Sequence, residues 1–253
     1  MKQLSDSFQM GPVTVKNRIA VPAMVCFDWT DDSGRVTDRH LAHYRALAQG
    51  GAGVIFSEAV CVTKRGRLHN TQLGLWEDEQ MEGWKRLADA CHEYGVPFLA
   101  QIHHAGINGM DDVADCPSDY TPAHAHHTPG KEMSLDRIVY IRNAFVKTAL
   151  RCKAAGLDGV ELHGCHGYLL SQFMSSRINH RTDEYGEDDT LFVKEILESI
   201  RIACGPDFCV GIRLAAFEPT MEDGFRHAKA LAPYVDFLDI SYGIDSDVSG
   251  CPA

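Results

Sequence analysis

Two histidines and a tyrosine follow a short apolar segment, and their spacing suits acid–base chemistry. Residues 158–162, DGVEL, predict a buried strand that ends at His163. His166 and Tyr168 come next on a turn that contains glycine on both sides of the second imidazole. In parallel α/β folds the carboxyl ends of the strands carry the chemistry, so we expect the three side chains to emerge there together.

These residue types favour a site that polarises a carbonyl group and moves a proton. Two imidazoles three residues apart can both donate N–H to one oxygen and stabilise negative charge on it. The phenol of Tyr168, with a reference pKa of about 10, is a poor base but a usable acid toward a carbanion-like carbon. An isolated H-x-x-H pattern also occurs in structural and zinc-binding sites, and both alternatives stay open on this pattern alone.

The elements around this segment alternate between strands and helices along the whole chain. Short apolar segments predict strands at residues 19–25, 53–59, 97–103, 159–163, 209–214 and 237–241. Apolar residues at spacings of three and four predict helices over residues 41–48, 84–91, 138–149 and 192–203. Thr37 and Ser134 stand where two of these helices would begin. Strands joined by crossover helices predict a parallel sheet that is buried on both faces.

With these elements in place, the chain resembles the old yellow enzyme family, the NADH:flavin oxidoreductases and FMN-dependent ene-reductases. The resemblance extends over most of the sequence rather than over one motif. It is carried by KNRIAVPAM at 16–24, GRVTDRHLAHYRALAQGGAGVIFSEAV at 34–60, GLWEDEQMEGWKRLADACHEYGVPFLAQIHHAG at 74–106, DGVELHGCHGYLLSQFMSSRINHRTDEYG at 158–186 and VGIRLAA at 210–216.

The resemblance implies an α/β fold, the TIM (β/α)8 barrel, of which this chain would supply about six βα units. We expect a single FMN-binding domain over residues 1–253 that is incomplete at its C-terminal side. The family's seventh and eighth strands hold the FMN phosphate, and nothing here matches them. An unclosed parallel sheet exposes edges. We therefore expect the chain to be part of a longer protein, or to form homo-oligomers or borrow strands from a partner.

The resemblance also implies the functional residues. The FMN contacts fall on Ala23, Met24, Val25, Ala59, Gln101 and Arg213. His163 and His166 would bind the carbonyl oxygen of an enone-type substrate, Tyr168 would deliver a proton to its alkene carbon, and Phe27 would line the substrate site. NADPH or NADH would be the reductant in a ping-pong reduction of activated C=C bonds. The alternative interpretation of Gln101 is a polar residue that caps a strand end.

Two of these positions carry specific alternatives. Val25 stands where relatives place a threonine or cysteine that hydrogen-bonds the flavin, and valine cannot donate, so we expect a shifted flavin reduction potential unless a one-residue slip brings Cys26 into that role. Arg213 lies inside an apolar segment, and a buried guanidinium needs an acceptor-rich partner. Outside the family interpretation, that partner would be an internal carboxylate such as Glu161 or Glu58.

Other histidines suggest a metal site only weakly. His103 and His104 are adjacent on a strand and must point to opposite sides, with His104 at a family position near the barrel mouth. His124, His126 and His127 lie in a long, proline-containing polar loop and are expected to be solvated. No grouped set of carboxylate ligands accompanies them, so we expect no metal.

Composition excludes several classes of function. The formal net charge of −11 argues against a nucleic-acid partner, and no apolar stretch is long enough to span a membrane. The N-terminus has no apolar signal core, so we expect a cytoplasmic protein. The nine cysteines contain no C-x-x-C pair, so neither a disulfide framework nor a zinc ribbon is indicated.

Two rival functions follow from the same residues. One is a metal-dependent or Schiff-base barrel, but Lys16, Lys64 and Lys153 lie outside the strand centres where a Schiff-base lysine is expected. The other is a truncated barrel remnant, inactive or completed by a partner, without flavin turnover.

Overall fold

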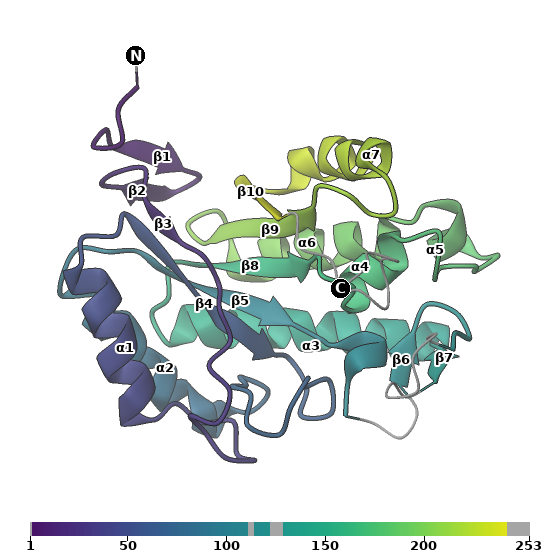
Figure 1. The fold of residues 1–253 in the computed structure, drawn as a ribbon, viewed down its shortest axis with the longest axis horizontal. Coiled ribbons are helices and arrows are strands. Elements are labelled where there is room, and N and C mark those ends of the chain that lie inside the picture. Colours follow the sequence, from purple (N-terminus) through teal and green to yellow (C-terminus); the bar gives the residue numbers. More distant parts are fainter. Residues whose placement is uncertain (1, 111–113, 122–128, 242–253) are drawn as a thin grey trace.

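A curled sheet of six parallel strands forms the centre of the protein in a computed structural model that describes residues 2–110, 114–121 and 129–241 (Figure 1). The strand order is β10-β9-β8-β5-β4-β3. The strands are β3 (Ala20–Val21), β4 (Val54–Cys61), β5 (Phe98–His103), β8 (Gly159–Gly164), β9 (Cys209–Ala215) and β10 (Phe237–Ser241). All six correspond to predicted strands, and the sheet is the parallel one that the alternation predicted. The fold is a TIM barrel of which these residues form part.

Helices cover the outer, convex face of this sheet (Figure 1). The longer ones are α1 (Asp38–Gln49), α2 (Met81–His92), α3 (Leu135–Ala154), α6 (Leu191–Cys204) and α7 (Met221–Leu231). Shorter helical segments are α4 (Leu169–Met174), α5 (Glu184–Glu187), η1 (Asp78–Gln80), η2 (Gly106–Asn108) and η3 (Ala232–Tyr234). Ser134 caps α3 as predicted, because its hydroxyl accepts the backbone N–H of Arg137 at 3.2 Å. Thr37 is the N-cap of α1, also as predicted.

The two faces of the sheet have different neighbours because successive side chains of a strand point to opposite sides. On the outer face, Ile55, Phe98 and Val160 belong to the large apolar core shared with the helices. On the inner face, a second apolar cluster joins strand residues to a hairpin, β1 (Phe8–Met10) and β2 (Val13–Val15). The hairpin packs on Val54, Phe56, Leu99 and Cys209. It therefore fills the interior at the amino-terminal ends of the strands.

Farther along the strands the inner face becomes polar. Gln101 is paired in register with Ala59 on one side and Glu161 on the other. His163, Arg213 and Asp239 form a second row across β8, β9 and β10. The sheet register therefore gathers these side chains toward the carboxyl ends of the strands.

The long loop after the third predicted strand contains more structure than predicted. Its described residues form η2 and two short paired strands, β6 (Ala114–Cys116) and β7 (Gly130–Glu132). His124, His126 and His127 lie outside the described residues, so the expectation that they are solvated stays a prediction.

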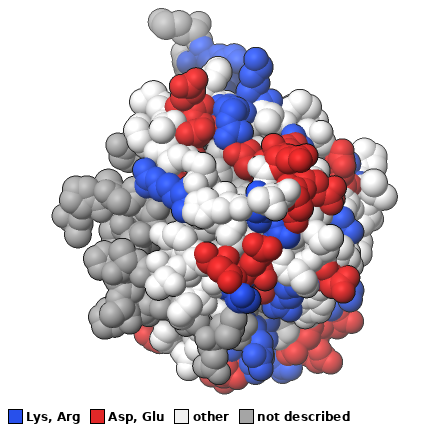
Figure 2. Space-filling view, turned by 90° about the vertical axis from the view of Figure 1, so that its right-hand side faces the viewer, with Lys and Arg blue, Asp and Glu red and all other residues white. Residues whose placement is uncertain are grey.

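The described residues contain no helix that is both long and apolar enough to cross a membrane. Figure 2 shows the face toward which β5, β8 and β9 point, and acidic and basic side chains are interspersed over its described residues. No continuous basic surface of the kind that binds nucleic acid is visible on that face.

Candidate functional site

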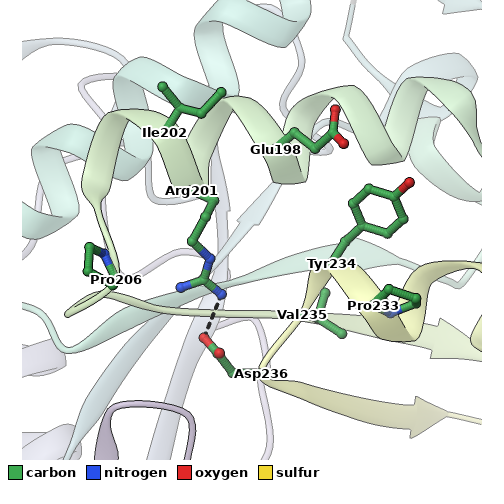
Figure 3. Close-up of a pocket in the computed structure, with 8 residues that line it drawn as sticks. All are labelled: Glu198, Arg201, Ile202, Pro206, Pro233, Tyr234, Val235 and Asp236. Atoms are coloured by element: carbon green, nitrogen blue, oxygen red, sulfur yellow. Dashed lines mark hydrogen bonds and ion pairs between the residues drawn. The ribbon is translucent and has the colours of Figure 1, made fainter.

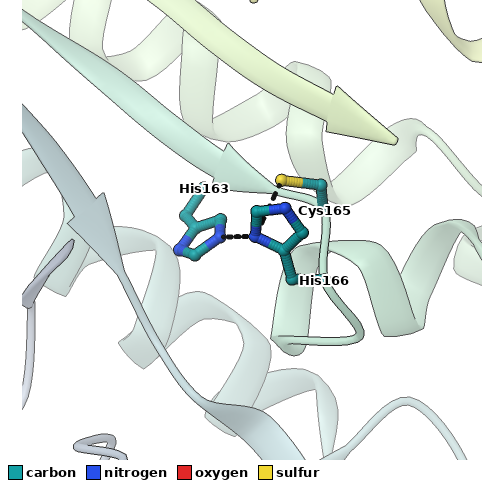
Figure 4. A group of neighbouring side chains, drawn as sticks. All are labelled: His163, Cys165 and His166. Carbon is teal, nitrogen blue, oxygen red and sulfur yellow. Dashed lines mark hydrogen bonds between the residues drawn. The ribbon is translucent and has the colours of Figure 1, made fainter. Parts of the chain in front are cut away.

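Two imidazole rings converge where β8 ends (Figure 4). Nε2 of His163 lies 2.9 Å from Nδ1 of His166, and the thiol of Cys165 lies 3.4 Å from the same Nδ1. His166 has a φ of 61°, in the left-handed region that a residue with a side chain rarely adopts. Such strain is found where the surroundings demand a particular side-chain direction. The two histidines are therefore brought together as predicted.

Two more aromatic rings complete this cluster. The ring centroid of Tyr168 is 4.9 Å from that of His163 and 4.5 Å from that of His103. The centroids of His103 and His163 are 4.9 Å apart. The sequence analysis did not assign His103 to the site, although it follows Gln101 by two residues and must share its face of the strand.

His104 points to the other side of β5, as the alternation requires. Its Nδ1 accepts the backbone N–H of Gly106 at 3.1 Å, and its Nε2 lies 3.5 Å from a carboxylate oxygen of Asp115. The inner face of the strand belongs to His103, and the family position of His104 near the barrel mouth stays a prediction.

Burial keeps these imidazoles neutral. Desolvation, with smaller contributions from neighbouring cationic groups, lowers the pKa of His103 to about 3 and that of His166 to about 4. The same causes hold the pKa of His163 well below its ordinary value. At neutral pH each ring therefore carries one N–H donor and one bare nitrogen.

A buried amide and carboxyl group lie deeper in the interior. Nε2 of Gln101 donates to Oε1 of Glu161 at 2.7 Å, and both residues are almost fully buried. Burial first, and then the charge of Asp239, raises the pKa of Glu161 to about 8. This carboxyl is therefore mostly protonated at neutral pH.

Arg213 reaches from β9 toward three neighbours. Its Nε lies 3.2 Å from a carboxylate oxygen of Asp239, and its terminal nitrogens donate to the backbone oxygen of Ala23 at 3.5 Å and the hydroxyl of Ser241 at 3.4 Å. The alternative interpretation named Glu161 or Glu58 as the ion-pair partner of Arg213. The structure shows Asp239 in that role. Asp239 and Ser241 were missed because their proximity follows from the pairing of β9 with β10, which the sequence does not display.

The predicted contacts on the first strand are more exposed. Met24 is 73% exposed. Val25 is half-buried, and the backbone N–H of Cys26 donates to the buried carboxylate of Glu58 at 3.0 Å. Burial, followed by the charge of Glu58, raises the pKa of the Cys26 thiol to about 11, so the thiol stays neutral.

The two remaining predicted residues differ in position. Ala59 lies on β4 beside Gln101, and its carbonyl oxygen accepts from the side chain of Gln72 at 2.9 Å. Phe27 packs edge-on against His69 with ring centroids 5.7 Å apart, and it is partly exposed. This ring contact of Phe27 is therefore with His69 and not with the imidazole cluster.

The polar atoms of the site are compatible with a planar, hydrogen-bonding group such as a flavin ring. Nδ1 of His163 and Oε2 of Glu161 are buried and have no hydrogen bond within the described part of the chain. Buried polar atoms normally have partners, so such a cluster indicates a ligand. Gln101 and Arg213 supply an amide and a cation, and the FMN residues assigned from the sequence stay a prediction.

The same turn also offers three possible ligands for a metal ion. One nitrogen each of His163 and His166 and the sulfur of Cys165 lie within 4.8 Å of one another. Burial holds the pKa of the Cys165 thiol well above its ordinary value, which opposes the thiolate form that metals bind. The expectation that the site holds no metal therefore stays a prediction.

A groove of about 700 Å³ lies at the opposite, amino-terminal ends of β9 and β10 (Figure 3). Arg201 of α6 crosses it to form an ion pair of 2.8 Å with Asp236. The same carboxylate accepts the backbone N–H of Val210 at 2.9 Å. Its charged groups thus serve the packing of the strands, and no titratable cluster comparable with the histidines lines the described groove.

Comparison with known proteins yields one family. Residues 3–235 match the NADH:flavin oxidoreductase / NADH oxidase family. The chain is 38% identical over 253 residues to an NADH oxidase of Thermoanaerobacter brockii, an alignment that covers 93% of this chain and 38% of the relative. It is 34% identical to an NADPH dehydrogenase of Bacillus cytotoxicus, an alignment that covers 95% of this chain and 72% of the relative.

Solved structures agree with this result. A 2-naphthoyl-CoA reductase in complex with 2-naphthoyl-CoA superposes with a TM-score of 0.91 at 27% identity, and the alignment covers 99% of this chain and 42% of that one. The chain therefore spans well under half the length of this structure and of the NADH oxidase.

Proposed function

The chain belongs to the NADH:flavin oxidoreductase / NADH oxidase family, and from this premise we propose that it reduces activated C=C bonds of α,β-unsaturated carbonyl compounds. FMN would be the cofactor, and NADH or NADPH the reductant, in a ping-pong cycle. Gln101 and Arg213, with backbone groups of Ala23, Met24, Val25 and Ala59, would hold the flavin. When bound, FMN supplies the hydride that the protein side chains cannot.

The protein side chains would bind and polarise the substrate. With a substrate bound, neutral His163 and His166 would each turn an N–H toward the carbonyl oxygen and stabilise the charge that builds there. Tyr168 packs on His163 and would deliver its phenolic proton to the alkene carbon. Phe27 would line the substrate site. His163, His166 and Tyr168 come from the end of β8 and the turn after it.

The proposal depends most on the distance between the two imidazole rings. The facing nitrogens of His163 and His166 lie 2.9 Å apart in neutral rings. Without a ligand, one of these nitrogens donates to the other, and in the proposal a carbonyl oxygen entering beside them would accept an N–H from each ring. The partly buried surroundings strengthen the interaction.

The test separates the two halves of the cycle by stopped-flow absorbance of the flavin. We expect His163→Gln with His166→Gln to slow oxidation of the reduced enzyme by an enone about 10²-fold or more, the usual loss for a donor to a developing oxyanion. Reduction by NADPH should stay nearly unchanged, as should both halves in His92→Gln, a partly exposed position on α2. Equal losses in both halves would contradict the assigned roles.

A second candidate is a barrel remnant that is completed by a partner or has no flavin turnover. It is favoured by the sheet edges, since β3 and β10 each have a neighbour on only one side among the described strands. Absorbance in the visible flavin bands, measured with and without added FMN, distinguishes the two. A protein that never acquires those bands supports the remnant.

A further inference from the structure

We propose that Ser241 is a positioning residue that sets the tautomer of His166. The inference rests on the proposed function in one respect, the role of His166 as a donor to the substrate oxygen. Ser241 is the last residue of β10 and is 8% exposed. Its Oγ lies 2.7 Å from Nε2 of His166, the ring nitrogen on the side away from His163.

The direction of this hydrogen bond follows from the other neighbour of Ser241. The guanidinium of Arg213 lies 3.4 Å from the same Oγ, and a guanidinium can only donate. The hydroxyl oxygen therefore accepts from Arg213 and keeps its single proton for a different partner. Among the described residues, the acceptor within reach of this hydroxyl is Nε2 of His166. In the proposal the hydroxyl donates to Nε2, which places the proton of the neutral ring on Nδ1.

The contacts on the other side of the ring agree. Nδ1 of His166 faces Nε2 of His163 at 2.9 Å, and a proton on Nδ1 can be donated there. In the competing tautomer Nδ1 would accept from Nε2–H of His163 at 2.9 Å, and the Ser241 proton would lose its acceptor on His166. The Nδ1–H tautomer satisfies both the hydroxyl at 2.7 Å and the facing nitrogen of His163, so it is the tautomer that Ser241 favours.

The backbone holds Ser241 where this argument needs it. Its carbonyl oxygen accepts the N–H of Ala216 at 2.8 Å, and its Cα pairs with Ala215 of β9. Ser241 follows Asp239 by two residues, so both side chains share the inner face with Arg213. A residue two strands away from β8 thus determines which nitrogen of His166 can donate to a ligand oxygen.

The test is nitrogen NMR of the histidine rings in labelled protein at neutral pH, with no flavin or substrate added. We expect the wild type to carry the His166 proton on Nδ1. Ser241→Ala should lower the ratio of the Nδ1–H to the Nε2–H form at least about fivefold, which corresponds to about 1 kcal/mol. Ser241→Thr keeps the hydroxyl and should restore the wild-type ratio. The ring of His92, bonded to Asp158 at 2.7 Å, reports that the fold is unchanged.

Two results would overturn the proposal. One is a wild-type protein in which His166 carries its proton on Nε2. The ring would then donate to Ser241, and the spectrum of the wild type alone would show it. The other is a Ser241→Ala protein with an unchanged His92 signal and an unchanged His166 ratio. Because the measurement uses neither cofactor nor substrate, failure of the proposed reduction would leave it standing, and its own failure would leave the half-reaction test standing.

Discussion

At the scale of single residues, the carboxyl of Glu161 gives the protein a pH-dependent stability. Its buried position raises the pKa to about 8 from a reference of 4.5. Below the reference value both the folded and the unfolded states are protonated, and the carboxyl is buried uncharged. Between 4.5 and about 8 the unfolded chain ionises first, so the folded state loses stability as the pH rises.

We expect Glu161→Gln to lack this pH dependence of stability. The amide has no charge to gain, so the free energy of unfolding of the wild type should fall relative to the variant by about 1.4 kcal/mol per pH unit across that interval. Urea unfolding from pH 5 to pH 8 measures both proteins. Parallel profiles would mean that the carboxyl is already charged or exposed in the folded state.

The residues of the site differ in how far the sequence could predict them. His163, His166 and Tyr168 are close in sequence, so a short strand followed by a turn is enough to group them. Arg213 could be recognised as a buried charge, but its partner Asp239 could not, because that contact depends on strand register. His103 could have been found from its spacing to Gln101, and Ser241 had no local signal.

At the scale of elements, Gly211 of β9 leaves room for the side chain of Phe237 in the neighbouring strand β10. A Cβ on Gly211 would lie 2.2 Å from the ring of Phe237 in the adjacent strand β10. The ring cannot fit beside a larger residue without moving. The pairing of β9 with β10, which places Arg213 beside Asp239 and Ser241, therefore depends on this small residue.

We expect Gly211→Ala to lower the free energy of unfolding by about 1–3 kcal/mol, as overpacking does in other cores. Phe237→Leu removes the colliding ring atoms, so the double variant should be less destabilised than the sum of the single ones. Denaturant unfolding of the four proteins measures the coupling. Strictly additive losses would show that the two side chains do not meet.

The elements themselves were mostly predictable. Each of the six predicted strands and four predicted helices is present, because buried parallel strands are apolar and their helices keep a regular apolar face. Helix α7 was not predicted, since Gly224 and His227 occupy its buried face with Leu231 and hide the apolar spacing. The β1/β2 hairpin was missed because each strand is three residues long.

At the scale of the whole molecule, the outermost strands of the described sheet each have one neighbour among the described strands. The edge strands β3 and β10 have unpaired sides within the described sheet, and Ile240 of β10 is 52% exposed. Unpaired strand edges with apolar side chains favour association. A single FMN-binding domain over residues 1–253, and its homo-oligomer, stay predictions.

We expect the chain to associate with itself in a concentration-dependent way, and Ile240→Lys to weaken that association. A charge on an edge strand opposes pairing with another copy. The matched control is Ile202→Lys, which is 85% exposed and lies on helix α6 rather than on an edge strand. Sedimentation velocity measures the effect. A wild type that is monomeric at every concentration, or equal effects of the two lysines, would contradict the expectation.

The central claim is that Gln101 and Arg213 face a flavin ring across from the paired imidazoles. It is tested most directly by fluorescence titration with lumiflavin, which has the ring but neither ribityl chain nor phosphate. We predict that the wild type quenches the fluorescence and that Arg213→Met weakens binding about tenfold or more, the loss expected for a charge-assisted hydrogen bond. Arg86→Met, which removes a charge on the exposed side of α2, should bind like the wild type. No binding by the wild type, or equal binding by all three proteins, would contradict the account.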